Sequence, residues 1–457
     1  MEINYGIDPP RLASKLDRLF EISGKKIQLL ERTWDPARGT PVFTVQGRYT
    51  TRGWTEWTQG FQYGLALLQF DATGDPSFLE LGRARTVERM APHVSHTGVH
   101  DHGFNNISTY GNLHRLIREG RIPADTWEPR FYELALKLSG AVQAARWSIT
   151  ADGLGYIYSF NGPHSLFVDT IRSLRSLGLA HRLGHVLMGE GDQPVSLLTR
   201  LVLHGRATAR YNIYYGQARD AFDIRGRTVH EAIFNRNDGR FRCPSTQQGY
   251  SPFSTWTRGL AWAITGFAEE LEFLDTVADS ELEALGGKAS VVAEFLEAAQ
   301  ATADFYIQHT PVDGIPYWDT GAPGLAYLGD YLNRPADPFN EHEPVDSSAA
   351  AIAAQGFIRL GKYLAGQGRP DEGQAYFQAG LTLADTLFDE PYLSTREEHQ
   401  GLILHSVYHR PNGWDYVPEG RRVPCGESSL WGDYHALELA VLLRREITGG
   451  PYPTFFS

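Results

Sequence analysis

Two aspartates stand in segments that suit acid–base chemistry. Asp101 lies within His100-Asp-His-Gly-Phe104, and Asp169 lies within Phe167-Val-Asp-Thr-Ile-Arg-Ser-Leu174. In a partly desolvated cleft the proton affinity of a carboxylate rises, which prepares it to give and take protons. Each residue also has a structural explanation. Asp101 can cap the N-terminus of a helix, and Asp169 can be a solvated carboxylate opposite the apolar stripe of a predicted helix.

Four histidines around Asp101 raise the question of a metal site. They are His93, His96, His100 and His102. Zinc binds histidine and carboxylate ligands, but this spacing matches no closed ligand set. The chain also contains no nucleophile elbow, phosphate loop or dinucleotide fingerprint in a suitable context. We therefore expect chemistry without a metal or another cofactor.

A third group of residues suits sugar binding. His230 and Gln248 precede a predicted helix that places Arg258 and Trp262 on one face. Aromatic rings stack on the apolar faces of sugars, whereas Gln, His and Arg bind hydroxyls and carboxylates. Ser428 stands at another helix start, where its hydroxyl either caps the helix or binds a ligand. Together these residues indicate acid–base chemistry on a neutral or carboxylated sugar.

The elements that must position these residues are mostly helices. Apolar residues recur at helical spacing, and many segments are rich in Ala and Leu, which favour helices. Few strands and no linker are predicted, so we expect one domain over residues 1–457. The expected helices are 10–22, 57–70, 77–90, 110–118, 131–147, 166–177, 194–214, 256–274, 289–306, 347–364, 372–387 and 430–445.

Three of these helices begin with similar aromatic motifs. Trp57-Thr-Gln-Gly, Trp256-Thr-Arg-Gly and Trp431-Gly-Asp each open an apolar run. Equivalent helix starts indicate a closed array whose ends line one cavity. About a dozen helices joined by short loops favour an α/α toroid over a bundle. The alternative is a generic all-α domain in which the tryptophans fill the core.

Composition excludes several classes of protein. The chain has 457 residues, of which 42% are hydrophobic and 12% aromatic, so it can form a large core and is not intrinsically disordered. Its formal net charge of −12 repels phosphate backbones, so we expect no nucleic-acid partner. No stretch approaches the roughly 20 apolar residues of a membrane span, so no membrane partner is expected. The oligomeric state is left open between a monomer and a homodimer.

The cysteines and the N-terminal segment favour a cytoplasmic location. Cys243 and Cys425 allow at most one disulfide, and two free thiols in a reducing compartment is the simpler interpretation. The first 12 residues lack the basic start and apolar run of a signal peptide.

Six segments, in order, resemble the unsaturated glucuronyl hydrolases of glycoside hydrolase family 88. Family 105, the unsaturated rhamnogalacturonyl hydrolases, is the near relative. The segments are 57–61, 100–104, 167–174, 248–262, 346–354 and 427–434, of which 248–262 is the most specific. The resemblance implies an all-α (α/α)6 barrel. It also implies a hydrolase that removes a 4,5-unsaturated uronic acid from the non-reducing end of lyase-generated oligosaccharides.

The resemblance also implies a role for each candidate residue. Members of the family hydrate the C4=C5 enol ether instead of displacing a group at the anomeric carbon. Asp169 is then the general acid that protonates C4 and afterwards accepts a proton from the attacking water. Asp101 is the partner that raises the proton affinity of Asp169 and holds sugar hydroxyls. The implied substrate-binding residues are Trp57, His230, Gln248, Arg258, Trp262 and Ser428.

Some alternatives remain open. The insert between Tyr211 and His230 is longer than the family pattern, so His204 is a rival for the histidine role. A sugar epimerase on the same toroid would need a pair of histidines across the cleft, whereas carboxylates occupy the matching positions here. A non-catalytic carbohydrate-binding toroid is the third possibility. The source of the glycan, its linkage and its sulfation are not predicted.

Overall fold

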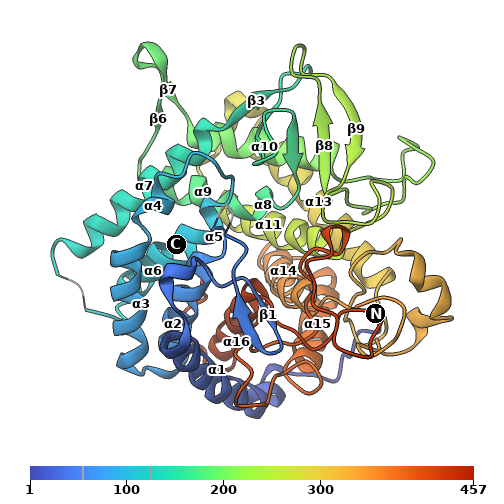
Figure 1. Ribbon diagram of the computed structural model, residues 1–457. Helices are drawn as coiled ribbons and strands as arrows, with labels where there is room; N and C mark the ends of the chain where they lie inside the picture. The colour runs from blue at the N-terminus through green and yellow to red at the C-terminus, as the bar shows by residue number, and fades with distance from the viewer. Residues whose placement is uncertain (54–55, 124, 457) are drawn as a thin grey trace.

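The chain folds as two concentric rings of helices (Figure 1). The computed structural model describes residues 1–53, 56–123 and 125–456. Within these ranges, outer and inner helices alternate along the chain. The outer helices are α1 (Ala13–Thr33), α3 (Pro76–Arg89), α7 (Glu128–Ala145), α10 (Leu197–Tyr211), α13 (Lys288–Gln308) and α15 (Pro370–Leu387). The inner helices are α2 (Gln59–Thr73), α5 (His102–Asn106) with α6 (Asn112–Arg118), α8 (Thr170–Ser173) with α9 (Arg175–Arg182), α11 (Thr257–Asp275), α14 (Ser347–Gly366) and α16 (Leu430–Thr448).

The inner helices contact one another in a closed cycle. α2 packs on α5, α5 on α8 and α8 on α11, after which α11, α14 and α16 return the cycle to α2. Most residues of α11, α14 and α16 are buried, as expected for helices enclosed by an outer ring. Short helices α4 (Ala91–Val94) and α12 (Asp279–Leu282) lie in the connections. Of the helices that the structure describes, none has the length and apolar character to cross a membrane.

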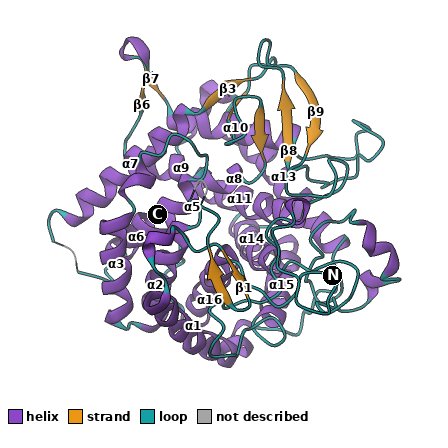
Figure 2. Ribbon diagram, in the orientation of Figure 1, coloured by secondary structure: helices purple, strands orange, loops and turns teal. Residues whose placement is uncertain are grey.

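Strands form small antiparallel sheets in the connections between the helices, and in this view the β1–β2 pair lies over the middle of the ring (orange in Figure 2). The hairpin of β1 and β2 lies against the start of α16, where the backbone N–H of Thr44 donates to the carbonyl of Ser428. The strands are β1 (Phe43–Val45), β2 (Arg48–Thr50), β3 (Trp147–Ile149), β4 (Gly155–Ile157), β5 (Ser165–Phe167), β6 (Leu187–Met188), β7 (Pro194–Val195), β8 (Glu231–Phe234) and β9 (Phe241–Ser245). β5, β8 and β9 make one sheet, and β1–β2, β3–β4 and β6–β7 pair separately.

Most expected helices lie where the sequence predicts them, but the helix expected over 166–177 is wrong at its start. Residues up to Phe167 form β5, which pairs with β8 through Phe167 and Glu231. The helix begins only at Thr170. Asp169 therefore lies immediately before a helix and not within one. Strand pairing across more than 60 residues replaced the local helical preference of this apolar run.

The first residues of the inner helices gather at one end of the ring. Trp57 precedes α2 and stacks on Trp431 at the start of α16, with 5.0 Å between ring centroids. Arg258 in the first turn of α11 donates to Asp346, the N-cap of α14, at 3.0 Å. Asp101, before α5, lies in the same region. The sequence predicted that the aromatic helix starts lie together, and they do so at one end of the barrel.

Further along the same helices, the centre of the ring contains buried ion pairs. Arg172 of α8 lies 2.8 Å from Glu269 of α11 and 3.0 Å from Glu438 of α16. Arg359 of α14 lies 2.8 Å from Glu272 of α11. Buried charges are tolerated only when they are paired with good geometry, so these contacts fix how the inner helices sit against each other.

A close approach between α5 and α8 sets the distance between the two candidate aspartates. Gly103 donates its backbone N–H to Ser173 Oγ at 2.8 Å. Ser173 Oγ in turn donates to the carbonyl of His100 at 2.8 Å. A Cβ atom on Gly103 would lie 2.2 Å from the carbonyl oxygen of Ser173, which only glycine avoids.

We expect Gly103→Ala to destabilise the protein by about 1–3 kcal/mol, because backbone atoms must move to relieve the overlap. The thermal unfolding midpoint measures this effect. Gly366→Ala is the matched control, since a Cβ atom there has no neighbour within 4 Å. Equal midpoints for the two variants would contradict the close approach of α5 and α8.

Candidate active site

A cavity of about 290 Å³ opens at the end of the ring where the inner helices begin. It brings together seven of the eight predicted site residues, namely Trp57, Asp101, Asp169, His230, Gln248, Arg258 and Trp262. It is also lined by residues that the sequence did not single out for this site, namely His100, Phe104, Phe160, Phe167, Gln247, Trp256, Tyr408, His409, Asn412 and Trp414. Apolar walls with a few converging polar groups are typical of small-molecule sites.

Asp101 and Asp169 occupy the N-cap positions of α5 and α8, but neither side chain caps its helix. Both carboxylates instead face His100, whose Nε2 lies 3.4 Å from Oδ1 of each. Both aspartates are buried. The two structural explanations are therefore wrong, because Asp101 makes no capping bond and Asp169 is not a solvated carboxylate.

The electrostatic environments of the two aspartates differ. Burial raises the pKa of Asp101 to about 6, and the nearby charge of Asp169 adds to this. Burial also acts to raise the pKa of Asp169, but the hydrogen bond and charge of His100 outweigh it and lower that pKa. In the free protein, the pKa of Asp169 is therefore lowered on balance, whereas the sequence led us to expect a raised one. The sequence did not reveal that an imidazole would lie between them.

Strand pairing carries His230 to the cavity. The backbone N–H of Val168 donates to the carbonyl of His230 at 2.9 Å, which places His230 beside Asp169. His230 Nδ1 accepts the backbone N–H of Gln247 at 3.0 Å, so Nε2 carries the hydrogen. Burial lowers the pKa of His230 to about 4, so the ring is neutral. Nε2–H has no partner among the described residues and is available to a ligand.

His204 does not share this position. Its Nδ1 accepts the backbone N–H of Ile157 at 2.9 Å, and the ring is not among the residues that line the cavity. The structure therefore places His230 and not His204 at the site.

Arg258 orients its neighbours. One terminal nitrogen donates to Asp346 at 3.0 Å, and the other donates to Gln248 Oε1 at 2.9 Å and to the carbonyl of Tyr408 at 2.8 Å. Because Oε1 of Gln248 is occupied, its NH₂ group is the part that can meet a ligand. Arg258 thus contributes positive charge to the cavity while it fixes the amide.

The aromatic residues divide between wall and core. Trp262 is nearly fully buried and packs on Phe104, with 4.9 Å between ring centroids, so its main role is to close the floor. Trp57 is partly exposed and forms a wall, backed by Trp431. Trp414, also partly exposed, packs against Tyr408 at 5.2 Å on the loop that borders the cavity.

The predicted position of Ser428 at the cavity is wrong. Its hydroxyl donates to the carbonyl of Ile403 at 2.7 Å, and its backbone N–H donates to Thr44 Oγ1 at 2.8 Å. The side chain is fully buried and does not line the cavity. It joins the β1–β2 hairpin to the loop before α16.

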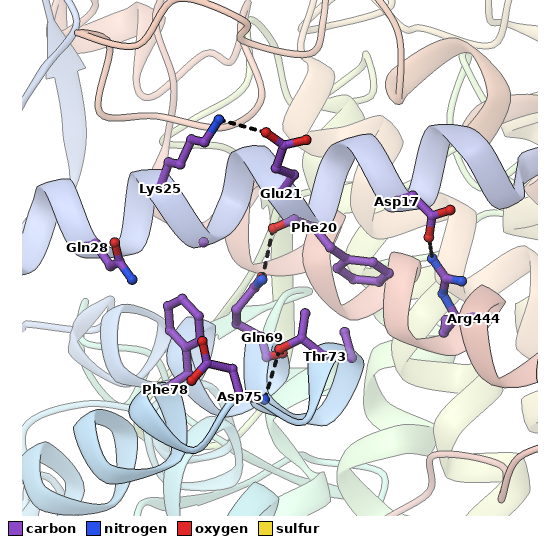
Figure 3. A pocket seen from close by; sticks show the side chains of 12 residues that line it. Asp17, Phe20, Glu21, Lys25, Gln28, Gln69, Thr73, Asp75, Phe78 and Arg444 are labelled. Atoms are coloured by element: carbon purple, nitrogen blue, oxygen red, sulfur yellow. Dashed lines mark hydrogen bonds and ion pairs between the residues drawn. The ribbon is translucent and has the colours of Figure 1, made fainter.

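A second hollow, of about 510 Å³, lies on the outer surface beside α1 (Figure 3). Four of its charged side chains form ion pairs, Lys25 with Glu21 at 2.7 Å and Arg444 with Asp17, and Asp75 accepts hydrogen bonds from Ser77. It brings together no buried acid–base groups. Among the described residues, no group of three or more His, Cys, Asp or Glu is arranged to hold a metal ion.

Comparisons with known proteins agree with the motifs. The unsaturated glucuronyl hydrolase of Bacillus sp. (strain GL1) is 26% identical over 416 residues, which cover 88% of this chain and 90% of that protein. The unsaturated chondroitin disaccharide hydrolase of Streptococcus pyogenes serotype M1 is 24% identical over 423 residues, which cover 90% and 86% of the two chains. No family model matches the chain.

A solved structure supports the fold. The crystal structure of an unsaturated glucuronyl hydrolase specific for heparin superposes with a TM-score of 0.72 at 19% identity, over 95% of this chain and 98% of the other. The predicted all-α (α/α)6 barrel and the resemblance to unsaturated glucuronyl hydrolases are both confirmed.

We expect Ser428→Ala to leave substrate affinity within about twofold of the wild type, because the hydroxyl faces away from the cavity. Loss of its hydrogen bond to Ile403 should cost about 1 kcal/mol of stability. Steady-state kinetics and thermal unfolding measure the two effects. A large increase in KM without loss of stability would show that Ser428 contributes to substrate binding.

Proposed function

We propose that this chain, a relative of the unsaturated glucuronyl hydrolases, removes a 4,5-unsaturated uronic acid from the non-reducing end of lyase-generated oligosaccharides. One observation carries the proposal: two buried aspartates stand at helix N-caps without capping and converge on one imidazole inside a cavity. Such carboxylates are held for proton transfer and not for helix stability.

The cavity suits the carboxylate of a uronic acid, although the whole chain carries a net charge of −12. Trp57, before α2, and Trp256, the N-cap of α11, line the cavity, and helix N-termini carry partial positive charge. Arg258, which also pairs with Asp346, lines the cavity, and the free Nε2–H of His230 adds a donor. These groups favour an anion at short range.

The proposed reaction starts at C4 of the sugar. Asp169 donates its proton to C4, and the π electrons of the C4=C5 bond form the new C–H bond. Positive charge then develops on C5 and the ring oxygen. Water attacks C5 and gives a proton to the Asp169 carboxylate, which restores the acid. The hemiketal formed at C5 opens, and the glycosidic bond breaks as a consequence.

The roles of the other residues follow from their positions. Asp101 holds sugar hydroxyls beside the reacting carbon. Trp57 stacks on the sugar, Trp262 closes the floor, and Arg258 orients the Gln248 amide toward the ligand. Positioned proton transfer of the Asp169 kind is worth roughly 10²–10⁴-fold in rate. An epimerase would need two histidines as the proton-transfer pair, whereas the two groups that converge on one point here are the aspartates.

Three further features belong to the proposal. Residues 1–457 act as one catalytic domain, since the six hairpins close a single ring. The protein works in the cytoplasm as a monomer or homodimer in polysaccharide degradation, which agrees with its two free thiols, Cys243 and Cys425. Its partner is a small saccharide and neither nucleic acid nor membrane.

We expect the protein to abolish the near-ultraviolet absorbance of unsaturated disaccharides, because hydration removes the conjugated double bond. A panel with α and β linkages, with and without sulfate, would identify the preferred glycan. Binding without loss of absorbance across the panel would favour a non-catalytic carbohydrate-binding protein.

Asp169→Asn should retain the fold and substrate binding but lose at least about 10²-fold in kcat, because the amide cannot protonate C4. Asp279→Asn is a control at a side chain that is 89% exposed. If Asp169→Asn stayed within about tenfold of the wild type, the general-acid role would be wrong.

A further inference from the structure

The proposed reaction requires a proton on Asp169, but in the free protein His100 lowers the pKa of that carboxylate. Asp169 is therefore ionised when the cavity is empty at neutral pH. A proton must reach it before C4 can be protonated. The nearest group that can supply one is His100, whose Nε2 lies 3.4 Å from Asp169 Oδ1.

The imidazole of His100 is held firmly in this position. Its side chain is 2% exposed and packs against two phenylalanine rings, with centroids 6.0 Å from Phe160 and 5.6 Å from Phe167. Its backbone carbonyl accepts hydrogen bonds from Ser173 Oγ and Gln143 Nε2, both at 2.8 Å. The ring therefore has little freedom to turn Nε2 away from the carboxylates.

The groups around His100 favour a proton on Nε2. Two carboxylate oxygens, one from Asp101 and one from Asp169, face this nitrogen at the same distance of 3.4 Å. A nitrogen lone pair would be repelled by these oxygens, whereas the positive charge of an imidazolium is attracted to both carboxylates.

Other charged and titratable groups also face the ring. Arg146 at the end of α7 opposes a positive imidazole, and burial opposes it too. The charges of Asp101 and Asp169 outweigh both effects, so the pKa of His100 is raised. The neighbouring His204 of α10 and His230 before β8 have their pKa values lowered by burial, to about 3 and about 4, and are neutral.

We propose that His100 is a positioning residue that keeps a proton resident between Asp101 and Asp169 and passes it to Asp169 when the anionic substrate enters. The proposal rests on the proposed function and extends it. The Nε2–H bond breaks, its electron pair stays on nitrogen, and an O–H bond forms at Asp169 Oδ1. No other reactant is needed.

Substrate binding supplies the cause of the transfer. A uronate carboxylate in the cavity places negative charge near Asp169 and excludes water, and both effects raise the proton affinity of that aspartate. During turnover the attacking water returns the proton to Asp169. When the product leaves, the proton moves back to His100, where Asp101 and Asp169 again stabilise the imidazolium.

The pH profile of kcat/KM tests this role. In the wild type, His100 holds the proton with a pKa above the ordinary value of about 6.5. In His100→Asn only the carboxylates can hold it, and the pKa of each rises because His100 no longer lowers it. The alkaline limb of kcat/KM should therefore move from the pKa of the imidazole to that of the carboxylate pair, with about a 10²-fold loss of kcat at pH 8 and a KM within about threefold.

His102→Asn is the matched control. His102, the first residue of α5, is also buried, but its ring nitrogens bond to Ser139 Oγ at 3.0 Å and to the carbonyl of His96 at 2.9 Å, and it does not line the cavity. This variant should keep the alkaline limb in place. An alkaline limb that does not move in His100→Asn would overturn the proposal.

A second measurement does not depend on turnover. The ring nitrogens of ¹⁵N-labelled histidine report protonation by NMR, and the His100 signal is the one lost in His100→Asn. We expect an imidazolium at pH 6.5 in the free protein and a lower pKa in both Asp101→Asn and Asp169→Asn. A neutral His100 at pH 6.5, or a His100 pKa that neither variant changes, would refute the proposal that His100 holds the proton.

The two measurements separate this inference from the proposed function. If the protein turns over unsaturated saccharides, but the alkaline limb does not move in His100→Asn and His100 is neutral, the proton-holding role of His100 is wrong and the proposed function stands. If His100 is an imidazolium whose pKa depends on both aspartates, but no unsaturated saccharide is turned over, the proposed function is wrong and the proton-holding role stands.

Discussion

The contact between α5 and α8 is the constraint on which the site depends. Gly103 lets the two helices approach until Ser173 bonds to the loop that carries His100 and Asp101. Asp169 is the N-cap of the partner helix, so the same contact brings its carboxylate to the ring nitrogen of His100 that Asp101 also faces. A wider spacing would separate the carboxylates and leave each free to cap its own helix. The glycine therefore matters to chemistry through distance alone.

The barrel must also compensate for the cost of buried carboxylates. Asp169 lies three residues before Arg172, which pairs with Glu269 and Glu438 in the centre of the ring. Arg258 pairs with Asp346 at the mouth of α14. Charges of both signs thus alternate along the inner helices from the cavity inward. Arginines thus pair with Glu269, Glu438 and Asp346, whereas the ion-pair partner of Asp101 and Asp169 is His100, a group that can release its proton.

The sequence predicted the features that local spacing determines. The helical period located the inner helices, and the i, i+4 spacing of Arg258 and Trp262 placed both at the cavity. Contacts distant in sequence were not predictable. β5 forms because Phe167 pairs with Glu231, and no local pattern marks that partner.

Two site residues show the same limit. Ser428 has the residue type and helix-start position of a ligand-binding hydroxyl, but a loop 25 residues earlier accepts its hydrogen bond. His100 was considered only as a metal ligand, although it directly precedes Asp101. Its role depends on Asp169, which is 69 positions away in the chain and 3.4 Å away in space. The sequence shows the type of each residue, whereas the residue that it contacts in space is determined only when the ring of helices closes.

The net charge of the chain adds a final physical point. At −12 the protein repels an anionic oligosaccharide at long range, whereas the helix N-termini, Arg258 and His230 attract it inside the cavity. At physiological ionic strength, exposed charges are screened beyond about 8–10 Å, so the repulsion fades while the partly buried attraction persists. In the proposed function, the enclosed cavity thus lets an acidic protein bind an acidic sugar. The same seclusion from water raises the pKa of Asp101, so the proposed anion binding and proton transfer have one structural cause.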